Sequence, residues 1–75
     1  MIKRGQAITL SNDIRYLVLS KVKYQDNYYL YLISMEKEPK AVICEEKDNK
    51  VVIVKDDEIL KNVILLFDKD IKEIL

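Results

Sequence analysis

IRYLVLSKVKYQDNYYLYLIS, residues 14–34, decides the fold of this chain. Two runs rich in Val, Ile, Leu and Tyr flank a short polar segment made of Gln25, Asp26 and Asn27. β-branched and aromatic residues on both sides of a polar turn are typical of a β-hairpin. The stretch therefore predicts one long hairpin, around which the remaining elements must pack.

Side-chain alternation along the hairpin predicts which residues share a face. One face of the first arm carries Tyr16, Val18, Ser20, Val22 and Tyr24, and the other carries Arg15, Leu17, Leu19, Lys21 and Lys23. A two-residue turn at Asp26 and Asn27 places Tyr24 opposite Tyr29 and Val22 opposite Tyr31. Leu30 and Leu32 then join Leu17 and Leu19. A shift of one residue at the tip would exchange these faces.

Shorter β-prone segments lie on both sides of the hairpin. Residues 6–10 follow Gly5, which allows a backbone bend, and a turn cluster at residues 11–13 separates them from the hairpin. After a charged connector that contains Pro39, residues 41–45 and 51–55 form two further strands around a turn at residues 47–49. Residues 6–55 therefore predict a five-stranded antiparallel β-meander.

The period of the apolar residues changes at residue 56, which predicts a helix over residues 56–75. Three acidic residues at 56–58 supply a cap and a favourable charge for a helix N-terminus. Asp68 and Asp70 can interrupt the helix beyond Phe67, so its continuity stays open. The apolar positions recur at helical intervals: Ile59, Leu60, Val63, Ile64, Phe67, Ile71 and Ile74.

These elements predict a single α+β domain over residues 1–75, a five-stranded antiparallel meander followed by one C-terminal amphipathic helix. Both faces of the predicted sheet carry apolar side chains, and one helix can cover only one of them. The sheet then either curls into a small SH3-like barrel or packs against a second copy. The core candidates are Leu17, Leu19, Leu30, Leu32, Val51, Ile53, Ile59, Val63, Phe67 and Ile71.

Composition argues against several classes of protein. Histidine is absent, Cys44 is the only cysteine and glycine occurs once, so neither a zinc site, a phosphate-binding loop nor an enzyme is expected, and no cofactor. We interpret Cys44 as a small core residue. A lone cysteine without an apolar leader predicts the cytoplasm, and the apolar run at residues 63–67 is too short to span a membrane.

The formal net charge is zero, which removes the field expected of a general nucleic-acid binder. The charge is divided unevenly, because residues 1–34 have a balance of +3 and residues 35–75 a balance of −3. We expect the two halves to attract each other within one fold.

The five tyrosines all fall within residues 16–31 and provide the candidate interaction surface. Tyrosine packs well across strands and keeps a polar hydroxyl at the rim, which suits a protein contact. A non-enzymatic interaction module that associates with itself or with another protein is therefore the expected function. The alternatives are a single-stranded nucleic-acid binder, with Lys3 and Arg4 also contacting phosphates, and an inhibitor of the phage or mobile-element type. The surface comprises Tyr16, Tyr24, Tyr29, Tyr31, Lys21 and Lys23.

Three segments also carry a resemblance: KRGQAITLSNDIRYLVLS at residues 3–20, YQDNYYLYLIS at 24–34 and VKDDEILKNVILLF at 54–67. They contain a G-Q-x-I-x-L opening, a Y-L-Y-L strand and a Leu-rich terminal helix. In this order they resemble a group of small bacterial proteins classed as domains of unknown function. The resemblance implies a β-meander followed by a C-terminal helix, and it carries no catalytic residues.

Overall fold

The computed structural model describes residues 2–48 and 50–74, apart from the side chain of Ile74. Neighbouring strands are antiparallel and follow the order β1-β2-β3-β4-β5 in one sheet. The predicted α+β fold, a five-stranded meander with a C-terminal helix, is confirmed. The turn predicted at residues 47–49 includes Asn49, which lies outside the described residues. The elements are β1 (Ala7–Thr9), β2 (Arg15–Tyr24), β3 (Asn27–Ser34), β4 (Ala41–Lys47), β5 (Lys50–Ile53) and α1 (Asp57–Ile74).

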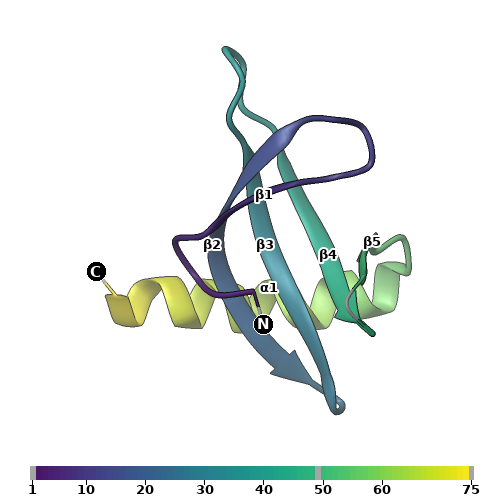
Figure 1. The fold of residues 1–75 in the computed structure, drawn as a ribbon. Helices are drawn as coiled ribbons and strands as arrows, with labels where there is room; N and C mark the ends of the chain where they lie inside the picture. The colour runs from purple at the N-terminus through teal and green to yellow at the C-terminus, as the bar shows by residue number, and fades with distance from the viewer. Residues whose placement is uncertain (1, 49, 75) are drawn as a thin grey trace.

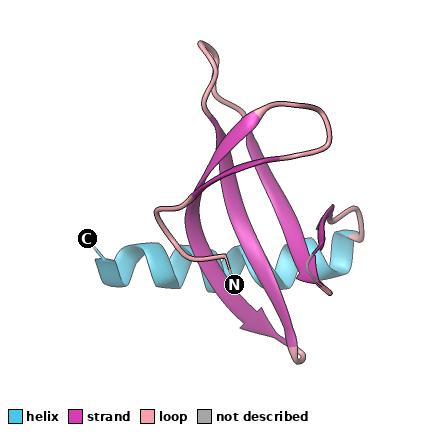
Figure 2. Ribbon diagram, viewed as in Figure 1, coloured by secondary structure: helices cyan, strands magenta, loops and turns pink. Residues whose placement is uncertain are grey.

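The sheet curls into a half-barrel, and α1 runs across its outer side at a steep angle to the strands (Figures 1 and 2). Gly5, with a φ of 86°, allows the bend before β1 that the sequence predicted. The loop after β1 and strand β5 approach each other and line a shallow hollow that includes Leu10 and Val51. Curling therefore brings the two ends of the sheet close together, while the described pairings leave it open between β1 and β5.

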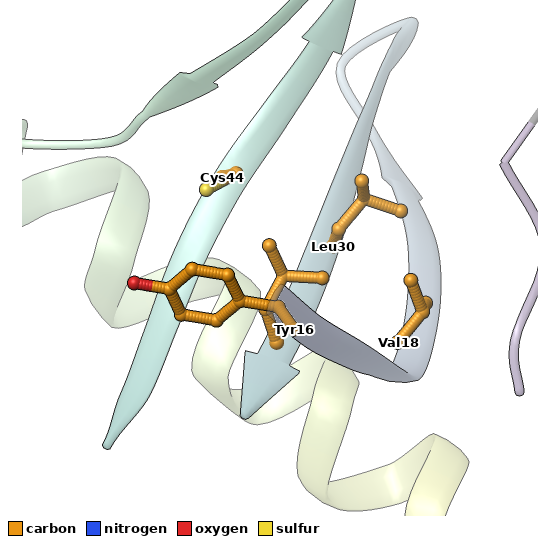
Figure 3. Close-up of a cluster of buried hydrophobic side chains, with 5 residues drawn as sticks. Tyr16, Val18, Leu30 and Cys44 are labelled. Carbon is orange, nitrogen blue, oxygen red and sulfur yellow. The ribbon is translucent and has the colours of Figure 1, made fainter. Parts of the chain in front are cut away.

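The inner side of the half-barrel holds the first of two hydrophobic cores. Its buried side chains point away from the helix (Figure 3). Ile2, Ile8, Leu10, Ile14, Val42 and Val51 pack around them. The curled sheet and the segments before β1 and β2 thus cover the apolar face that the helix leaves uncovered. The buried members are Tyr16, Val18, Leu30, Leu32 and Cys44.

The second core lies between the outer side of the sheet and α1. Tyr29, Val63 and Phe67 are almost completely buried there. The rings of Tyr31 and Phe67 pack with their centroids 5.6 Å apart, in a tilted arrangement that favours aromatic pairs. Two clusters on opposite sides of one sheet therefore make up the core of this small domain.

The hairpin tip differs from the prediction by one residue. Tyr24 pairs with Asn27, so the two turn residues are Gln25 and Asp26, with φ values of 49° and 65°. Two successive positive φ angles match the twist that antiparallel strands need at a two-residue turn. The predicted turn at Asp26 and Asn27 is therefore wrong. Val22 faces Tyr29 instead of Tyr31.

A β-bulge in β2 corrects the predicted faces of the hairpin. Val18 pairs with Leu32 and Ser20 with Tyr31, which leaves Leu19 as an extra residue in β2. Even-numbered side chains of β2 before the bulge consequently face the inner side of the sheet, and even-numbered side chains after it face the outer side. Tyr16 and Val18 enter the inner core, whereas Val22 and Tyr24 pack in the core beneath α1. The prediction that residues 16, 18, 20, 22 and 24 share one face is wrong for this reason.

The same bulge corrects the predicted partners of the leucines. Leu30 and Leu32 lie in the inner core with Tyr16 and Val18, and not with Leu17 and Leu19. Among the other core candidates, Val63 and Phe67 are buried, and Val51 and Ile59 pack at the margins of the two clusters. Ile53 is 48% exposed, because β5 is short and ends at the rim of the sheet. Its assignment to the core is wrong.

Helix α1 begins at a cap and remains continuous beyond Phe67. The Asp56 carboxylate accepts hydrogen bonds from the backbone N–H groups of Glu58 and Ile59, at 2.9 and 3.2 Å, as the acidic cluster predicted. Asp70 does not interrupt the helix, and its carboxylate accepts a hydrogen bond from the hydroxyl of Ser20, which is buried on the side of the sheet that faces α1. Arg4 binds the same carboxylate at 3.3 Å. This contact fixes the second half of α1 to β2.

The hydrogen bond between Ser20 and Asp70 predicts two stability changes of different size. Ser20→Ala removes the donor but leaves Asp70 partly solvated and near Arg4, so the free energy of unfolding should fall by about 1 kcal/mol. Asp70→Ala leaves the buried hydroxyl without an acceptor and should cost roughly 1–3 kcal/mol. Urea unfolding measures both, with the exposed Ser11→Ala as control. Ser20→Ala and Ser11→Ala should differ, and equal stabilities would contradict the assigned contact.

Candidate functional site

An apolar groove with a volume of about 730 Å³ lies between α1 and strands β4 and β5. We call it the α1–β4 groove. Apolar side chains make up most of its lining, and the only charged residue among them is Asp68. The lining residues are Tyr31, Ala41, Val42, Ile43, Ile53, Val54, Leu60, Ile64, Phe67, Asp68 and Ile71.

The groove exists because α1 covers only part of the outer face of the sheet. Val63 and Phe67 point into the core and are 0% and 1% exposed. Ile64, one residue further around the helix, is 51% exposed and borders the groove. Ile53 borders it from β5 and is also about half exposed, at 48%. Apolar side chains from two elements therefore converge on one open surface.

Strand β4 adds backbone groups to the edge of this groove. Ala41 and Val42 pair with β3, whereas the pairing between β4 and β5 begins only at Cys44 and Ile53. The backbone N–H of Val54 donates to the carbonyl oxygen of Ile43 at 3.0 Å, which ends the contact between the two segments. The outer edge of β4 at residues 41–42 thus lies beside the groove, beyond the described pairing with β5.

The tyrosines and lysines of the predicted interaction surface do not come together on one face. Tyr16 is 4% exposed in the inner core, where its hydroxyl accepts a hydrogen bond from Asn12. Tyr29 is 2% exposed beneath α1, with Tyr24 and Tyr31 packed around it. The prediction that these four tyrosines share one face is therefore wrong. The bulge sends Tyr16 to one side of the sheet and the other three to the opposite side.

The two lysines of that predicted surface flank a tyrosine that was not part of it. Lys21 Nζ lies 4.7 Å from the ring centroid of Tyr28, and Lys23 Nζ lies 5.9 Å from it. Tyr28 is 36% exposed, whereas the Lys21 side chain is only 15% exposed. Lys23 is thus the more accessible cation beside this ring.

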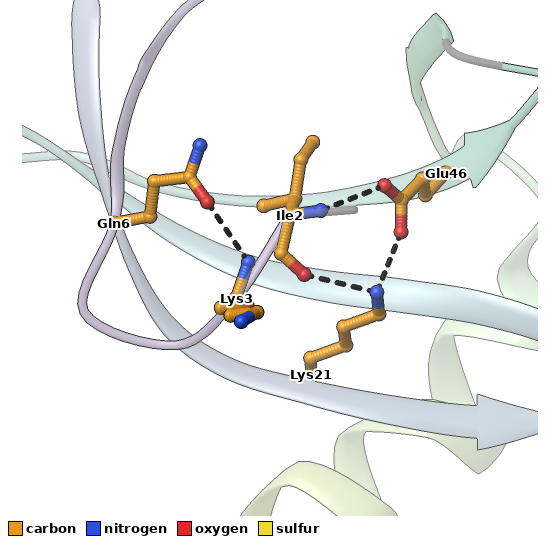
Figure 4. Close-up of polar contacts among 5 residues, drawn as sticks. All are labelled: Ile2, Lys3, Gln6, Lys21 and Glu46. Atoms are coloured by element: carbon orange, nitrogen blue, oxygen red, sulfur yellow. Dashed lines mark hydrogen bonds and ion pairs between the residues drawn. The ribbon is translucent and has the colours of Figure 1, made fainter.

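Lys21 instead belongs to a polar network that joins the two halves of the chain (Figure 4). Its ammonium group lies 2.8 Å from a carboxylate oxygen of Glu46 and donates to the carbonyl oxygen of Ile2 at 2.9 Å. The backbone N–H of Ile2 donates to the other oxygen of Glu46 at 3.2 Å. With Arg4 and Asp70, this pair shows the expected attraction between the basic first half and the acidic second half.

Cys44 lies in the inner core with no exposed surface, as its interpretation as a core residue predicted. Burial raises the pKa of its thiol to about 11. A thiol needs to be deprotonated to act as a nucleophile or a metal ligand. Cys44 is therefore a packing residue in this fold.

Among the residues that the structure describes, no group of three or more Cys, Asp or Glu side chains is arranged to hold a metal ion. In the same part of the chain, α1 is not apolar enough to cross a lipid bilayer.

The sequence analysis singled out several residues that line the groove, but it did not predict the groove itself. Phe67 and Ile71 were placed in the core, and Ile64 was one of several periodic apolar positions. The apolar residues of α1 nevertheless span a wide arc around the helix, which is the feature of the sequence that indicates the groove. Leu60, Ile64 and Ile71 lie to one side of the line through Val63 and Phe67. The sheet covers only part of this arc, since Ile64 is 51% exposed.

In comparisons with known proteins, no family model, no curated protein and no solved structure matches this chain. The resemblance to small bacterial domains of unknown function therefore stays a prediction.

The Glu46 network predicts a pH-dependent contribution to stability. Burial by itself raises the pKa of Glu46, but the hydrogen bonds from Lys21 and Ile2 and the Lys21 charge outweigh it and lower the pKa below 4.5. A lowered pKa in the folded state stabilises the protein above the pKa of the unfolded chain, and this stabilisation is lost as the pH falls through the folded value. Glu46→Gln should therefore reduce the free energy of unfolding at pH 7, by roughly 1–3 kcal/mol.

Urea unfolding at pH 7 and pH 3 measures this effect in the wild type and in Glu46→Gln. The difference between them should narrow as the pH falls towards 3, because protonation of Glu46 in the folded state removes the stabilisation that its carboxylate provides. Glu36→Gln, in the exposed connector, is the matched control and should change little at either pH. A difference that is as large at pH 3 as at pH 7 would rule out the ionic origin.

The burial of Cys44 predicts an inert thiol. Native protein at pH 8 should react with a disulfide reagent such as Ellman's reagent at a rate limited by opening of the fold, and unfolded protein should react at once. An exposed thiol introduced by Ser11→Cys is the positive control and should react immediately in the native state. Rapid reaction of native wild-type protein would contradict the burial of Cys44.

Proposed function

We propose that this chain is a small, non-enzymatic protein-interaction module that binds a polypeptide, either a second copy or another protein, in the α1–β4 groove. The observation that supports the proposal is the convergence of exposed apolar side chains from two elements, with Ile64 51% and Ile53 48% exposed. Burying apolar surface contributes about 25 cal/mol per Å², so a partner that covers both side chains gains binding free energy. Contiguous exposed apolar surface on a small domain is typical of an interaction site.

The chemistry of the lining favours a polypeptide over a small metabolite. Sites for small molecules place several polar groups around the ligand to fix its orientation. Among the side chains that line this groove, only the Tyr31 phenol and the Asp68 carboxylate are polar. An apolar segment of protein chain needs few such groups.

The same lining supports a role without catalysis. A carboxylate and a phenol alone do not supply a nucleophile paired with a base. Cys44 is buried on the opposite side of the sheet, in the inner core. A reduced, buried thiol also fits the cytoplasmic location predicted from the sequence.

Peptides selected from a random displayed library test this proposal, with the amide NMR spectrum of the labelled protein as the measurement. We expect selected peptides to shift the amide signals of residues 41–43 and 60–71. Ile64→Glu, inside the groove, should weaken binding at least tenfold. Leu65→Glu is the matched control, since Leu65 is 66% exposed but does not line the groove, and it should bind like the wild type.

Other results would overturn the proposal. Selected peptides whose effects do not reach the groove, or equal affinities for the Ile64→Glu and Leu65→Glu variants, would show that the groove is not the binding site. Salt-dependent binding of a labelled single-stranded oligonucleotide, with shifts at Lys23 and Tyr28 instead, would support the nucleic-acid alternative.

A further inference from the structure

The apolar side of α1 carries a second stripe beside the residues that pack on the sheet. Leu60, Ile64, Phe67 and Ile71 all line the α1–β4 groove. They are separated by four, three and four residues. Alternating steps of four and three are the spacing by which one helix packs along another. The stripe covers about 16 Å of the helix, at 1.5 Å per residue.

Only part of this stripe is used within the molecule. Phe67 is 1% exposed, because it also belongs to the core beneath the helix. Ile64, at the centre of the stripe, remains 51% exposed. The stripe thus contains the buried Phe67 next to the exposed Ile64. This arrangement suits a second helix placed alongside α1.

Four charged side chains follow the solvent side of the stripe. Asp57, Lys61, Asp68 and Lys72 are all exposed and alternate in sign along the helix. Steps of four, seven and four residues keep them on one side of α1. The ammonium group of Lys72 lies 3.0 Å from the Asp68 carboxylate, so side chains of this row extend along the helix surface.

The charges of this row match the charges of the same row in a second copy only when the second helix runs in the opposite direction. In an antiparallel second helix, Asp57 faces Lys72 of the copy, and Lys61 faces Asp68 of the copy. Both pairs have their midpoint between residues 64 and 65, and the apolar stripe has its midpoint between residues 65 and 66. One two-fold axis therefore aligns the charges and the apolar residues to within one residue. A parallel arrangement would place like charges opposite each other.

We propose that the occupant of the α1–β4 groove is the α1 helix of a second copy of this chain, packed antiparallel about a two-fold axis. This inference rests on the proposed function, because it names the partner of the same groove. The resulting contact is isologous, as in most homodimers, with each Lys61 facing Asp68 of the other copy. The charges select the antiparallel orientation, and the apolar stripe supplies most of the buried surface.

Charge reversal at exposed positions tests the pairing without disturbing the core. Lys61→Asp places two carboxylates opposite each other, twice per dimer, and Asp68→Lys does the same with two ammonium groups. Each variant alone should dimerise about tenfold more weakly than the wild type at low salt. A one-to-one mixture of the two should recover wild-type affinity, because both cross-pairs are then of opposite charge. The double variant Lys61→Asp/Asp68→Lys should also recover it.

Sedimentation equilibrium over a range of concentrations measures these affinities, and circular dichroism confirms that each variant is folded. Lys69→Asp is the matched control: it reverses a charge on an exposed position of α1 outside the row and should leave dimerisation unchanged. Ile64→Glu should abolish dimerisation. Groove-binding peptides from the displayed library should convert the dimer to monomer.

Three outcomes would overturn the pairing. A wild-type protein that stays monomeric while peptides bind in the groove would show that the occupant is a different protein, and the proposed function would stand. Dimerisation that tolerates both single reversals, or a mixture that fails to recover, would place the contact on another surface or in another orientation. A monomer to which no peptide binds would overturn both proposals together.

Discussion

The extra residue in β2 is the constraint on which the packing of both cores depends. Strict alternation from Tyr16 to Tyr24 would send every second side chain of the strand to the same face. With Leu19 as a bulge, Val18 enters the inner core, and two residues later Ser20 reaches the opposite side, where it donates to Asp70 of α1. One strand therefore supplies apolar residues to the half-barrel and an anchoring hydroxyl to the helix. A strand without the bulge could not serve both cores, and part of one of them would be exposed to solvent.

Much of the architecture follows from local patterns in the sequence. The hairpin, the bend at Gly5, the Asp56 cap and the helix are all decided by residues close together in the chain, and these predictions are confirmed. The tip and the bulge are decided differently. Gln25 and Asp26 take positive φ angles because that turn brings Val22 opposite Tyr29, a preference that comes from the packed sheet. Propensity alone favoured Asp26 and Asn27, which tolerate such angles more readily.

The candidate site was harder to predict, because it depends on where one element ends relative to another. Exposure of tyrosine cannot be inferred from its position in a strand, and the bulge divided Tyr16 from Tyr29 and Tyr31. The groove arises because β5 ends at Ile53 and α1 crosses the sheet at a steep angle, leaving part of the apolar arc uncovered. The spacing of Leu60, Ile64, Phe67 and Ile71 is visible in the sequence. Whether these residues are buried or left exposed depends on which side of α1 faces the sheet.

The order of the elements in the chain has a consequence for biosynthesis. The ribosome completes all five strands before α1 is made, so Tyr29 and Tyr31 on the outer side of the sheet have no cover while the helix is still being translated. Nascent chains with bare apolar sheet surface are prone to aggregation and are typical clients of chaperones. Arg4 and Ser20 reach Asp70 across 66 and 50 positions of sequence, so the final closure of the fold waits for the second half of the helix to emerge.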